Sequence, residues 1–203
     1  MKILLTGFEA FEGVEDNPSQ WLMEHFAALQ TAFTEAELLC FTLATAYEGA
    51  GEKIRQLIDH HQPDLILCTG VAAGRSELSL ERVALNLNQS EIADNEGERR
   101  EGSFIREGAA LAYHSSSDVQ RIKEKLNQQG MPLKVSNHAG TYVCNHVYFC
   151  ALDEIQEYRP VPPCLFMHIP QVSGQALALW GLVKSVEMIL LEMQGIKNRR
   201  LRR

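Results

Sequence analysis

The segment from Asp64 to Thr69 restricts the fold more than any other stretch, because it is almost entirely apolar over the length of one strand. A strand of this composition is buried on both faces, which occurs where helices cover both sides of a largely parallel sheet. Short apolar runs and segments of helical periodicity alternate on either side of it. The sequence therefore predicts an α/β fold, a three-layer α/β/α sandwich around a central mixed, mostly parallel sheet.

The other elements are predicted from apolar runs that end at glycine or proline and from apolar residues spaced three and four apart. The first helix opens at Asn17-Pro18-Ser19, with Asn17 or Ser19 as its cap, and its apolar face extends to Leu29. We expect residues 92–108 to form a loop. The predicted strands are Lys2–Thr6, Glu37–Leu43, Asp64–Thr69, Leu78–Leu87, Ala109–His114, Leu133–Val135 and Cys164–Pro170, and the remaining predicted helices are Tyr47–His61, Asp118–Gln129, Cys144–Arg159 and Ser173–Met193.

The chain's 203 residues are enough for one domain with its own core, and no linker or repeat divides them, so we expect a single domain over 1–203. With 45% hydrophobic and 22% charged residues, it has the composition of a soluble globular protein. A net charge of -7 argues against a nucleic-acid partner, which needs a basic surface. One basic cluster at the C-terminal end is more typical of a solvated tail: Lys197, Arg199, Arg200, Arg202 and Arg203.

No apolar run approaches the length of a membrane span, and no signal-peptide pattern follows Met1, so we expect a cytoplasmic protein without membrane contact. The cysteines are odd in number and include neither a C-x-x-C pair nor a zinc-type spacing. We therefore expect reduced thiols and no metal site at these five residues: Cys40, Cys68, Cys144, Cys150 and Cys164.

Cys144 differs from the other cysteines because it stands between a turn of small residues, Ala139-Gly140-Thr141, and a predicted helix. The free N–H groups at a helix N-terminus favour a thiolate, which lowers the pKa of a cysteine there, and they can also receive the oxyanion of an acyl intermediate. This setting makes Cys144 a candidate nucleophile. The alternative is that it is simply a small buried apolar residue.

Two further side chains are placed where they could serve such a nucleophile. His168 ends an apolar strand, and imidazole is the usual partner of a reactive cysteine. The alternatives are a purely structural His168, or a base supplied by His138 or His146, which flank the cysteine in sequence. Glu81 lies in an apolar run where a buried carboxylate needs a partner, although a surface pair with Arg82 would also explain it.

Two loops are candidate binding elements. The first, Gly70–Gly74, follows the central strand at its carboxyl end, where open α/β sheets bind ligands, but it lacks the ending of a phosphate loop. The second, Phe8–Asp16, contains two phenylalanines, and aromatic residues in such a position more often cover the core than line a pocket.

Four stretches resemble the pyrrolidone-carboxylate peptidases, also called pyroglutamyl peptidase I, which are cysteine peptidases. Gly70–Asn86 resembles the glutamate signature of this family, Ser136–Tyr148 resembles its cysteine signature, and Met167-His168-Ile169-Pro170 resembles its histidine strand. At the start of the chain, Thr6-Gly7-Phe8-Glu9 with Phe11 and Asn17-Pro18-Ser19 matches as well. The matches span nearly the whole chain in the order of the family.

The resemblance implies a Glu81–Cys144–His168 triad that removes the N-terminal pyroglutamyl residue from peptides through an acyl-enzyme, without a metal or other cofactor. Relatives of this kind form dimers or tetramers, so a homo-oligomer is implied as well. The pyroglutamyl lactam is flat and uncharged, which suits an apolar slot with a few amide hydrogen bonds. By similarity, the residues of that slot are Phe8, Phe11 and Tyr142, with Asn17 bracing the loop and the backbone at Val71 meeting the lactam.

The chain departs from the family pattern in the first loop and in the segment Gln89–Asn95, where relatives read Asp-Ala-Arg-Ile-Pro-Asp-Asn. Ala10 and Glu12 stand where relatives have proline and glycine, and Glu91 stands where they have an arginine thought to help the oxyanion region. A carboxylate pointing into the site would raise the cost of forming an oxyanion and a thiolate. These departures leave two alternatives, a cysteine hydrolase of another small cyclic amide, and a binding protein that has lost turnover.

Overall fold

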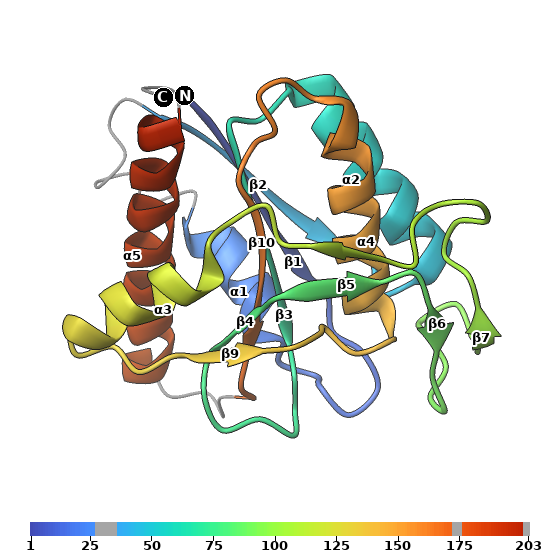
Figure 1. The fold of residues 1–203 in the computed structure, drawn as a ribbon. Helices are drawn as coiled ribbons and strands as arrows, with labels where there is room; N and C mark the ends of the chain where they lie inside the picture. The colour runs from blue at the N-terminus through green and yellow to red at the C-terminus, as the bar shows by residue number, and fades with distance from the viewer. Residues whose placement is uncertain (27–35, 172–175, 201–203) are drawn as a thin grey trace.

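The structure is a computed structural model that describes residues 1–26, 36–171 and 176–200 (Figure 1). A six-stranded sheet has the order β2-β1-β3-β10-β4-β9, and two small sheets pair β5 with β8 and β6 with β7. The strands are β1 (Lys2–Phe8), β2 (Glu37–Leu43), β3 (Leu65–Val71), β4 (Ser79–Glu81), β5 (Val83–Leu85), β6 (Asn88–Gln89), β7 (Glu101–Ser103), β8 (Ala112–His114), β9 (Lys134–Ser136) and β10 (Cys164–Ile169). The helices are α1 (Pro18–Phe26), α2 (Tyr47–His61), α3 (Val119–Gln128), α4 (Val143–Glu154) and α5 (Ala176–Arg200), with a short 3-10 turn, η2 (Ile155–Glu157).

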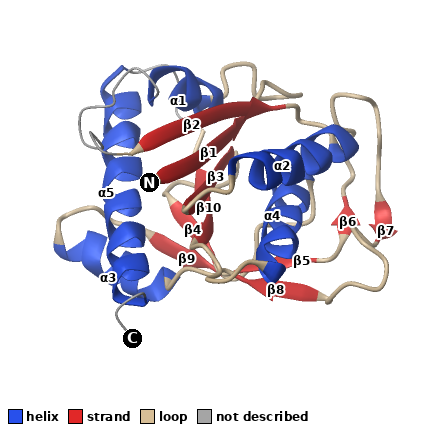
Figure 2. Cartoon of the chain, turned by 90° about the horizontal axis from the view of Figure 1, so that it is seen from above, coloured by secondary structure: helices blue, strands red, loops and turns tan. Residues whose placement is uncertain are grey.

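Helices cover both faces of the large sheet, which confirms the predicted three-layer α/β fold. Helices α1, α3 and α5 lie on one face, and α2 and α4 lie on the other (Figures 1 and 2). Every residue of β3 is buried, as expected for a central strand covered on both sides. Neighbouring strands are parallel except β10 and β4, which are antiparallel, so the sheet is mixed but mostly parallel.

Most predicted elements are confirmed, and the single strand predicted over Leu78–Leu87 is wrong. That stretch forms two short strands: β4 joins the large sheet beside β10, whereas β5 leaves it and pairs with β8. The change happens at Arg82, whose N–H donates to the carbonyl of Ser136 at the end of β9. Apolar alternation continues through both strands, so the pattern alone did not reveal that they belong to different sheets.

Part of the predicted loop 92–108 is also strand, since β7 pairs with β6. The last helix continues beyond Met193 to Arg200. The predicted helix start at Ser173, the apolar residue Leu29 and the tail residues Arg202 and Arg203 lie outside the described residues, as do the side chains of Lys197, Arg199 and Arg200.

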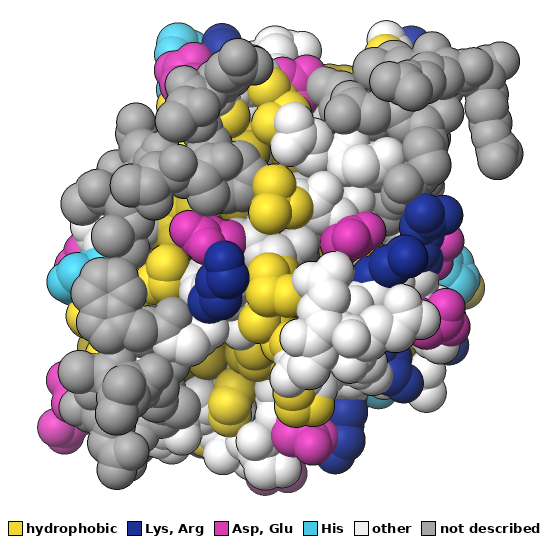
Figure 3. All heavy atoms as spheres, turned by 90° about the vertical axis from the view of Figure 1, so that its left-hand side faces the viewer, with side chains coloured by type: hydrophobic (Ala, Val, Ile, Leu, Met, Phe, Trp, Pro, Cys, Tyr) yellow, Lys and Arg dark blue, Asp and Glu magenta, His cyan; other side chains and the backbone are white. Residues whose placement is uncertain are grey.

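One outer face of the molecule is formed by α1, α3 and α5, and a band of hydrophobic side chains runs across it (Figure 3). Leu191 of α5 lies on this helix with 47% of its surface exposed. Within the described ranges, no helix is long and apolar enough to cross a membrane.

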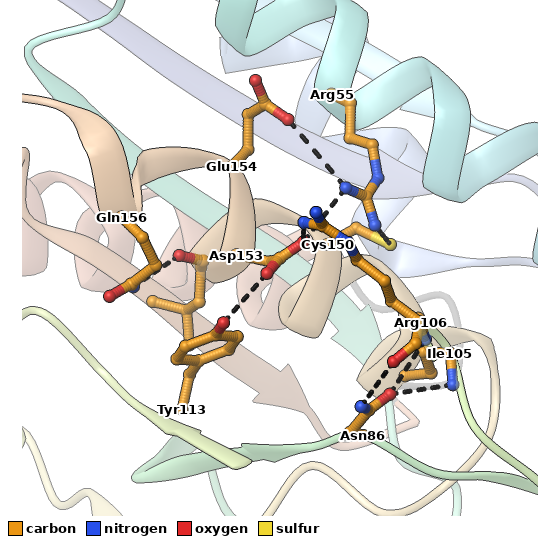
Figure 4. Close-up of polar contacts among 10 residues, drawn as sticks. Arg55, Asn86, Ile105, Arg106, Tyr113, Cys150, Asp153, Glu154 and Gln156 are labelled. Carbon is orange, nitrogen blue, oxygen red and sulfur yellow. Dashed lines mark hydrogen bonds and ion pairs between the residues drawn. The ribbon is translucent and has the colours of Figure 1, made fainter. Parts of the chain in front are cut away.

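The segment between β5 and β8 is held on α4 by a polar cluster (Figure 4). The buried carboxylate of Asp153 accepts from Arg106 at 2.7 Å, from Arg55 of α2 at 3.2 Å and from the hydroxyl of Tyr113 at 2.9 Å. Asn86 binds the backbone of residues 105 and 106 through its side-chain amide. These contacts attach the excursion that follows Glu81 to α4, the helix whose first turn contains Cys144.

Candidate active site

Cys144 lies in the first turn of α4, with its sulfur against the end of the central strand. A Cβ added to Gly70 of β3 would lie 2.7 Å from the Cys144 Sγ atom, so the glycine leaves the space that the thiol occupies. Tyr142, the residue before the helix, makes no side-chain cap bond to the first turn. The first N–H groups of that turn have no acceptor within the helix.

His168 and Glu81 lie on the same face of the sheet as the thiol. His168 pairs with Gly70 in the register between β10 and β3, and β4 runs along the other side of β10. Phe166, two residues before His168, packs in the core beneath α4, whereas Leu80 packs in the opposite core. Because side chains alternate along a strand, His168 and Glu81 both face α4.

The Nδ1 atom of His168 lies 2.7 Å from the Oε1 atom of Glu81, and both side chains are almost fully buried. With Nδ1 bonded to the carboxylate, the other ring nitrogen, Nε2, is left for the thiol side. Tyr148 of α4 donates its hydroxyl to the backbone carbonyl of Glu81 at 3.2 Å. The three sequence-predicted residues, Cys144, His168 and Glu81, thus come together where α4 meets the sheet.

Arg75 is the charged partner of Glu81, and sequence reasoning missed it. Its guanidinium is 2.5 Å from Glu81 Oε1 and also binds the hydroxyls of Ser79 and Ser136. The alternative pair between Glu81 and Arg82 is wrong, because Arg82 points toward Asn137. The sequence contained an indication of this pair, since a buried carboxylate needs a cation and Arg75 stands six residues before Glu81. The adjacent Arg82 was considered as the partner instead.

The two competing histidines have other contacts. His146 is buried, lies against Gly51 of α2, and binds Asn88 through Nδ1 at 3.0 Å. Burial, together with the charge of Arg55, lowers the pKa of His146 to about 4. His138 is exposed, and its Nδ1 accepts the N–H of Gly140 at 3.1 Å.

The expectation of a lowered cysteine pKa is wrong for the resting structure. Burial, followed by the charge of Glu81, raises the pKa of the Cys144 thiol to about 12, and these effects exceed those of Arg75 and of the hydrogen bond from its own backbone N–H. Burial lowers the pKa of His168, with Glu81 acting in the opposite direction. Although burial alone would raise it, the pKa of Glu81 is lowered by His168, Ser136 and Arg75. At neutral pH the site therefore holds a neutral thiol, a neutral imidazole and a carboxylate.

Aromatic rings surround the outer side of this site. Phe8 is buried at the end of β1, and its ring also lies next to Gly70. Tyr142 is half-buried, with its ring centre 6.3 Å from that of Phe11 and 5.6 Å from that of Tyr47. The residues that the resemblance assigned to the lactam slot are therefore neighbours across two loops and the start of α4.

Hydrogen bonds connect the first loop to the segment after β6. The Asn17 amide donates to the Glu9 carbonyl at 2.9 Å, and its oxygen accepts the N–H of Ser19. Asn95 donates to the Ala10 carbonyl and to the Glu9 carboxylate, both at 2.8 Å. The Tyr142 hydroxyl donates to the Ala93 carbonyl at 2.9 Å. Asn17 thus braces the loop from one side, and the segment 93–95 braces it from the other.

The remaining positions named from the sequence are Val71, Glu12 and Glu91. Val71 is buried at the end of β3, and the N–H of the next residue donates to the carbonyl of Ile169. Glu12 and Glu91 are both exposed. Glu91 lines a surface hollow together with Arg99 and Arg100, and none of the residues lining this hollow belongs to the Cys–His–Glu group. Within the described ranges, no cluster of three or more His, Cys, Asp or Glu side chains is arranged to hold a metal ion.

Comparisons with known proteins show the family of this chain. The family model described as Pyroglutamyl peptidase matches residues 1–196. The pyrrolidone-carboxylate peptidase of Bacillus amyloliquefaciens is 38% identical over 176 residues, which are 87% of this chain and 81% of the relative. That of Streptococcus pyogenes serotype M4 is 35% identical over 207 residues, covering 98% of this chain and 95% of the relative.

Two solved structures have the same fold. The crystal structure of pyroglutamyl peptidase I from Bacillus amyloliquefaciens superposes with a TM-score of 0.82 at 35% identity and covers 93% of this chain and 94% of its own. Pyrrolidone carboxyl peptidase from the hyperthermophile Pyrococcus furiosus superposes with a TM-score of 0.88 at 28% identity and covers 97% and 100%. The chain therefore belongs to the pyroglutamyl peptidase family, the cysteine hydrolases that remove an N-terminal pyroglutamyl residue from peptides.

Proposed function

We propose that Cys144, His168 and Glu81 carry out this hydrolysis as nucleophile, general base and orienting carboxylate. The observation that supports the roles most directly is the short Glu81–His168 contact on the strand beside Gly70, against which the Cys144 sulfur lies. A carboxylate on Nδ1 fixes the ring tautomer, so that Nε2 can accept a proton.

Because thiol and imidazole are both neutral at rest, proton transfer accompanies the attack rather than preceding it. Nε2 of His168 takes the proton as the Cys144 sulfur bonds to the acyl carbon, and the free N–H groups of the first turn of α4 stabilise the oxyanion. His168 then gives the proton to the leaving amine as the C–N bond breaks. Water, activated by the same imidazole, hydrolyses the thioester and releases pyroglutamate.

Specificity follows from the apolar slot. A flat lactam can lie among Phe8, Phe11 and Tyr142 with little desolvation cost, whereas an N-terminal amine would bring an unpaired positive charge into the same place. We expect the backbone near Val71 to supply amide hydrogen bonds to the lactam. Prolyl and alanyl amides should therefore be poor substrates.

The test is hydrolysis of pyroglutamyl-aminomethylcoumarin by the purified protein beside Cys144→Ala, with prolyl and alanyl amides as controls. We expect activity on the pyroglutamyl amide alone and a fall in kcat of about four orders of magnitude or more in the variant. Cys40→Ala is the matched control, because Cys40 is a partly exposed thiol on the edge strand β2, and it should retain activity. Activity that survives Cys144→Ala would disprove the proposed nucleophile.

The proposal extends to the domain organisation, the cellular location and the oligomeric state of the protein. We propose a single catalytic domain over 1–203 that works in a reducing cytoplasm, which fits five free cysteines. We also propose a homo-oligomer, for which the hydrophobic band over α5 and the exposed Leu191 are supporting observations (Figure 3). Light scattering of the purified protein measures this directly, and a monomer at micromolar concentration would exclude it.

A further inference from the structure

The Glu81 carboxylate is buried completely, and burying a charge is costly unless another charge lies beside it. His168 touches it but is neutral at pH 7, because burial lowers the pKa of the imidazole. Within the described part of the chain, Arg75 is the other charged partner of Glu81. Its guanidinium therefore supplies a positive charge beside the carboxylate, in addition to the contacts with His168 and Ser136 that also favour the ionised form of Glu81.

The position of this guanidinium is defined by three bonds to two strands, β4 and β9. It contacts Oε1 of Glu81, the same oxygen that accepts from His168, and the hydroxyl of Ser79 on β4. Its second nitrogen donates to the hydroxyl of Ser136 at 3.2 Å, at the end of β9 where the loop toward Cys144 begins. Arg75 thus connects the carboxylate to β4 and to the short edge strand β9.

We propose that Arg75 is a positioning residue of the catalytic machinery: its guanidinium holds the Glu81 carboxylate, and through it the His168 imidazole, in the orientation that serves Cys144. This inference rests on the proposed triad and adds a fourth member that touches neither substrate nor reacting atoms. A planar guanidinium holds a carboxylate and two hydroxyls in a fixed fork geometry, whereas the ammonium of lysine is a compact charge on a flexible stem.

The experiment compares Arg75→Gln with Arg75→Lys in the pyroglutamyl-aminomethylcoumarin assay, with thermal melting of each variant. We expect Arg75→Gln to lower kcat about 10- to 100-fold with KM within about twofold, because a small displacement of a catalytic group is costly whereas substrate contacts stay intact. Arg75→Lys keeps the charge and should recover part of the loss. Arg82→Gln is the matched control, since this neighbouring arginine points toward Asn137, and it should behave as wild type.

A double-mutant cycle shows whether Arg75 acts through Glu81. In the Glu81→Gln background there is no carboxylate charge to hold, so Arg75→Gln should reduce kcat far less than in the wild type. An equal factor in both backgrounds, an effect on KM alone, or a kcat within twofold of wild type would overturn the proposal. If Arg75→Gln does not fold, the same cycle with Arg75→Lys provides the test.

The outcome also separates this inference from the proposed triad. An inactive Cys144→Ala beside a fully active Arg75→Gln defeats the positioning role alone. Activity retained by Cys144→Ala defeats the triad itself.

Discussion

Gly70→Ala tests the placement of the nucleophile without changing any catalytic group. The added Cβ would lie 2.7 Å from the Cys144 sulfur, whereas ordinary contacts begin at 3.4 Å, so the sulfur must move by about 0.7 Å. The other neighbours of that Cβ, Phe166 at 3.1 Å and Phe8 at 3.3 Å, are ring atoms packed in the core and leave little room for the backbone to shift instead.

A displacement of this size moves the thiol away from the position that His168 and the first turn of α4 serve. Since misplacing a reacting atom by about 1 Å can cost about 100-fold, we expect Gly70→Ala to lower kcat/KM about 10- to 100-fold. The effect on stability should be smaller. Alanine restricts the unfolded chain and gains about 0.4–1 kcal/mol, while overpacking costs about 1–3 kcal/mol, which leaves a net loss of about 0–2.6 kcal/mol.

The assay measures kcat/KM on pyroglutamyl-aminomethylcoumarin and the rate of Cys144 alkylation by iodoacetamide, with thermal melting to show that the variant is folded. Gly74→Ala is the matched control, because Gly74 lies in the loop after the same strand and a Cβ there meets nothing within 4 Å. A folded Gly70→Ala protein with the wild-type kcat/KM and alkylation rate would refute the placement of the thiol against β3.

Three further predictions concern the surroundings of the site. Asp153→Asn should lower the free energy of unfolding by about 2–3 kcal/mol at pH 7, because it removes the charge that pairs with Arg55 and Arg106. Although burial alone would raise it, the pKa of Asp153 is lowered by Arg106 and Tyr113. Its contribution is therefore complete above about pH 4 and is lost as the pH falls further, so the melting curves of the two proteins should converge with increasing acidity, with Asp59→Asn as an exposed control. Tyr142→Phe should raise KM about three- to tenfold and leave kcat within about twofold, since it removes only the hydroxyl bond to Ala93; a loss confined to kcat would contradict this. Glu91→Arg should change kcat/KM by less than about threefold, because Glu91 is exposed beside Arg99 and Arg100 and surface charges are well screened; a tenfold gain would show that its charge reaches the thiol.

Local pattern was sufficient for the elements whose burial follows from near neighbours. The apolar run after Asp64 predicted a central strand, and the small turn before Cys144 predicted that this residue begins a helix. The sequence also predicted the α/β sandwich. The carboxylate, the thiol and the imidazole, in this order, were assigned from motifs that resemble those of the family. Each of these properties depends on residues that are close together along the chain.

Properties that depend on distant partners were decided by the tertiary structure. Glu81 forms its ion pair with Arg75 rather than Arg82 because its carboxylate, on β4 beside β10, faces the interior. Since side chains alternate between the two faces of a strand, the next residue, Arg82, points the other way, toward Asn137. Burial of Cys144 against Gly70 raises the pKa of the thiol and keeps it protonated, although the helix N-terminus favours the thiolate. The local sequence pattern does not show which of these two effects is larger. Strand pairing and desolvation are set by residues far apart in sequence. For that reason the groups of the site were evident from the chain, whereas their partners and protonation states required the fold.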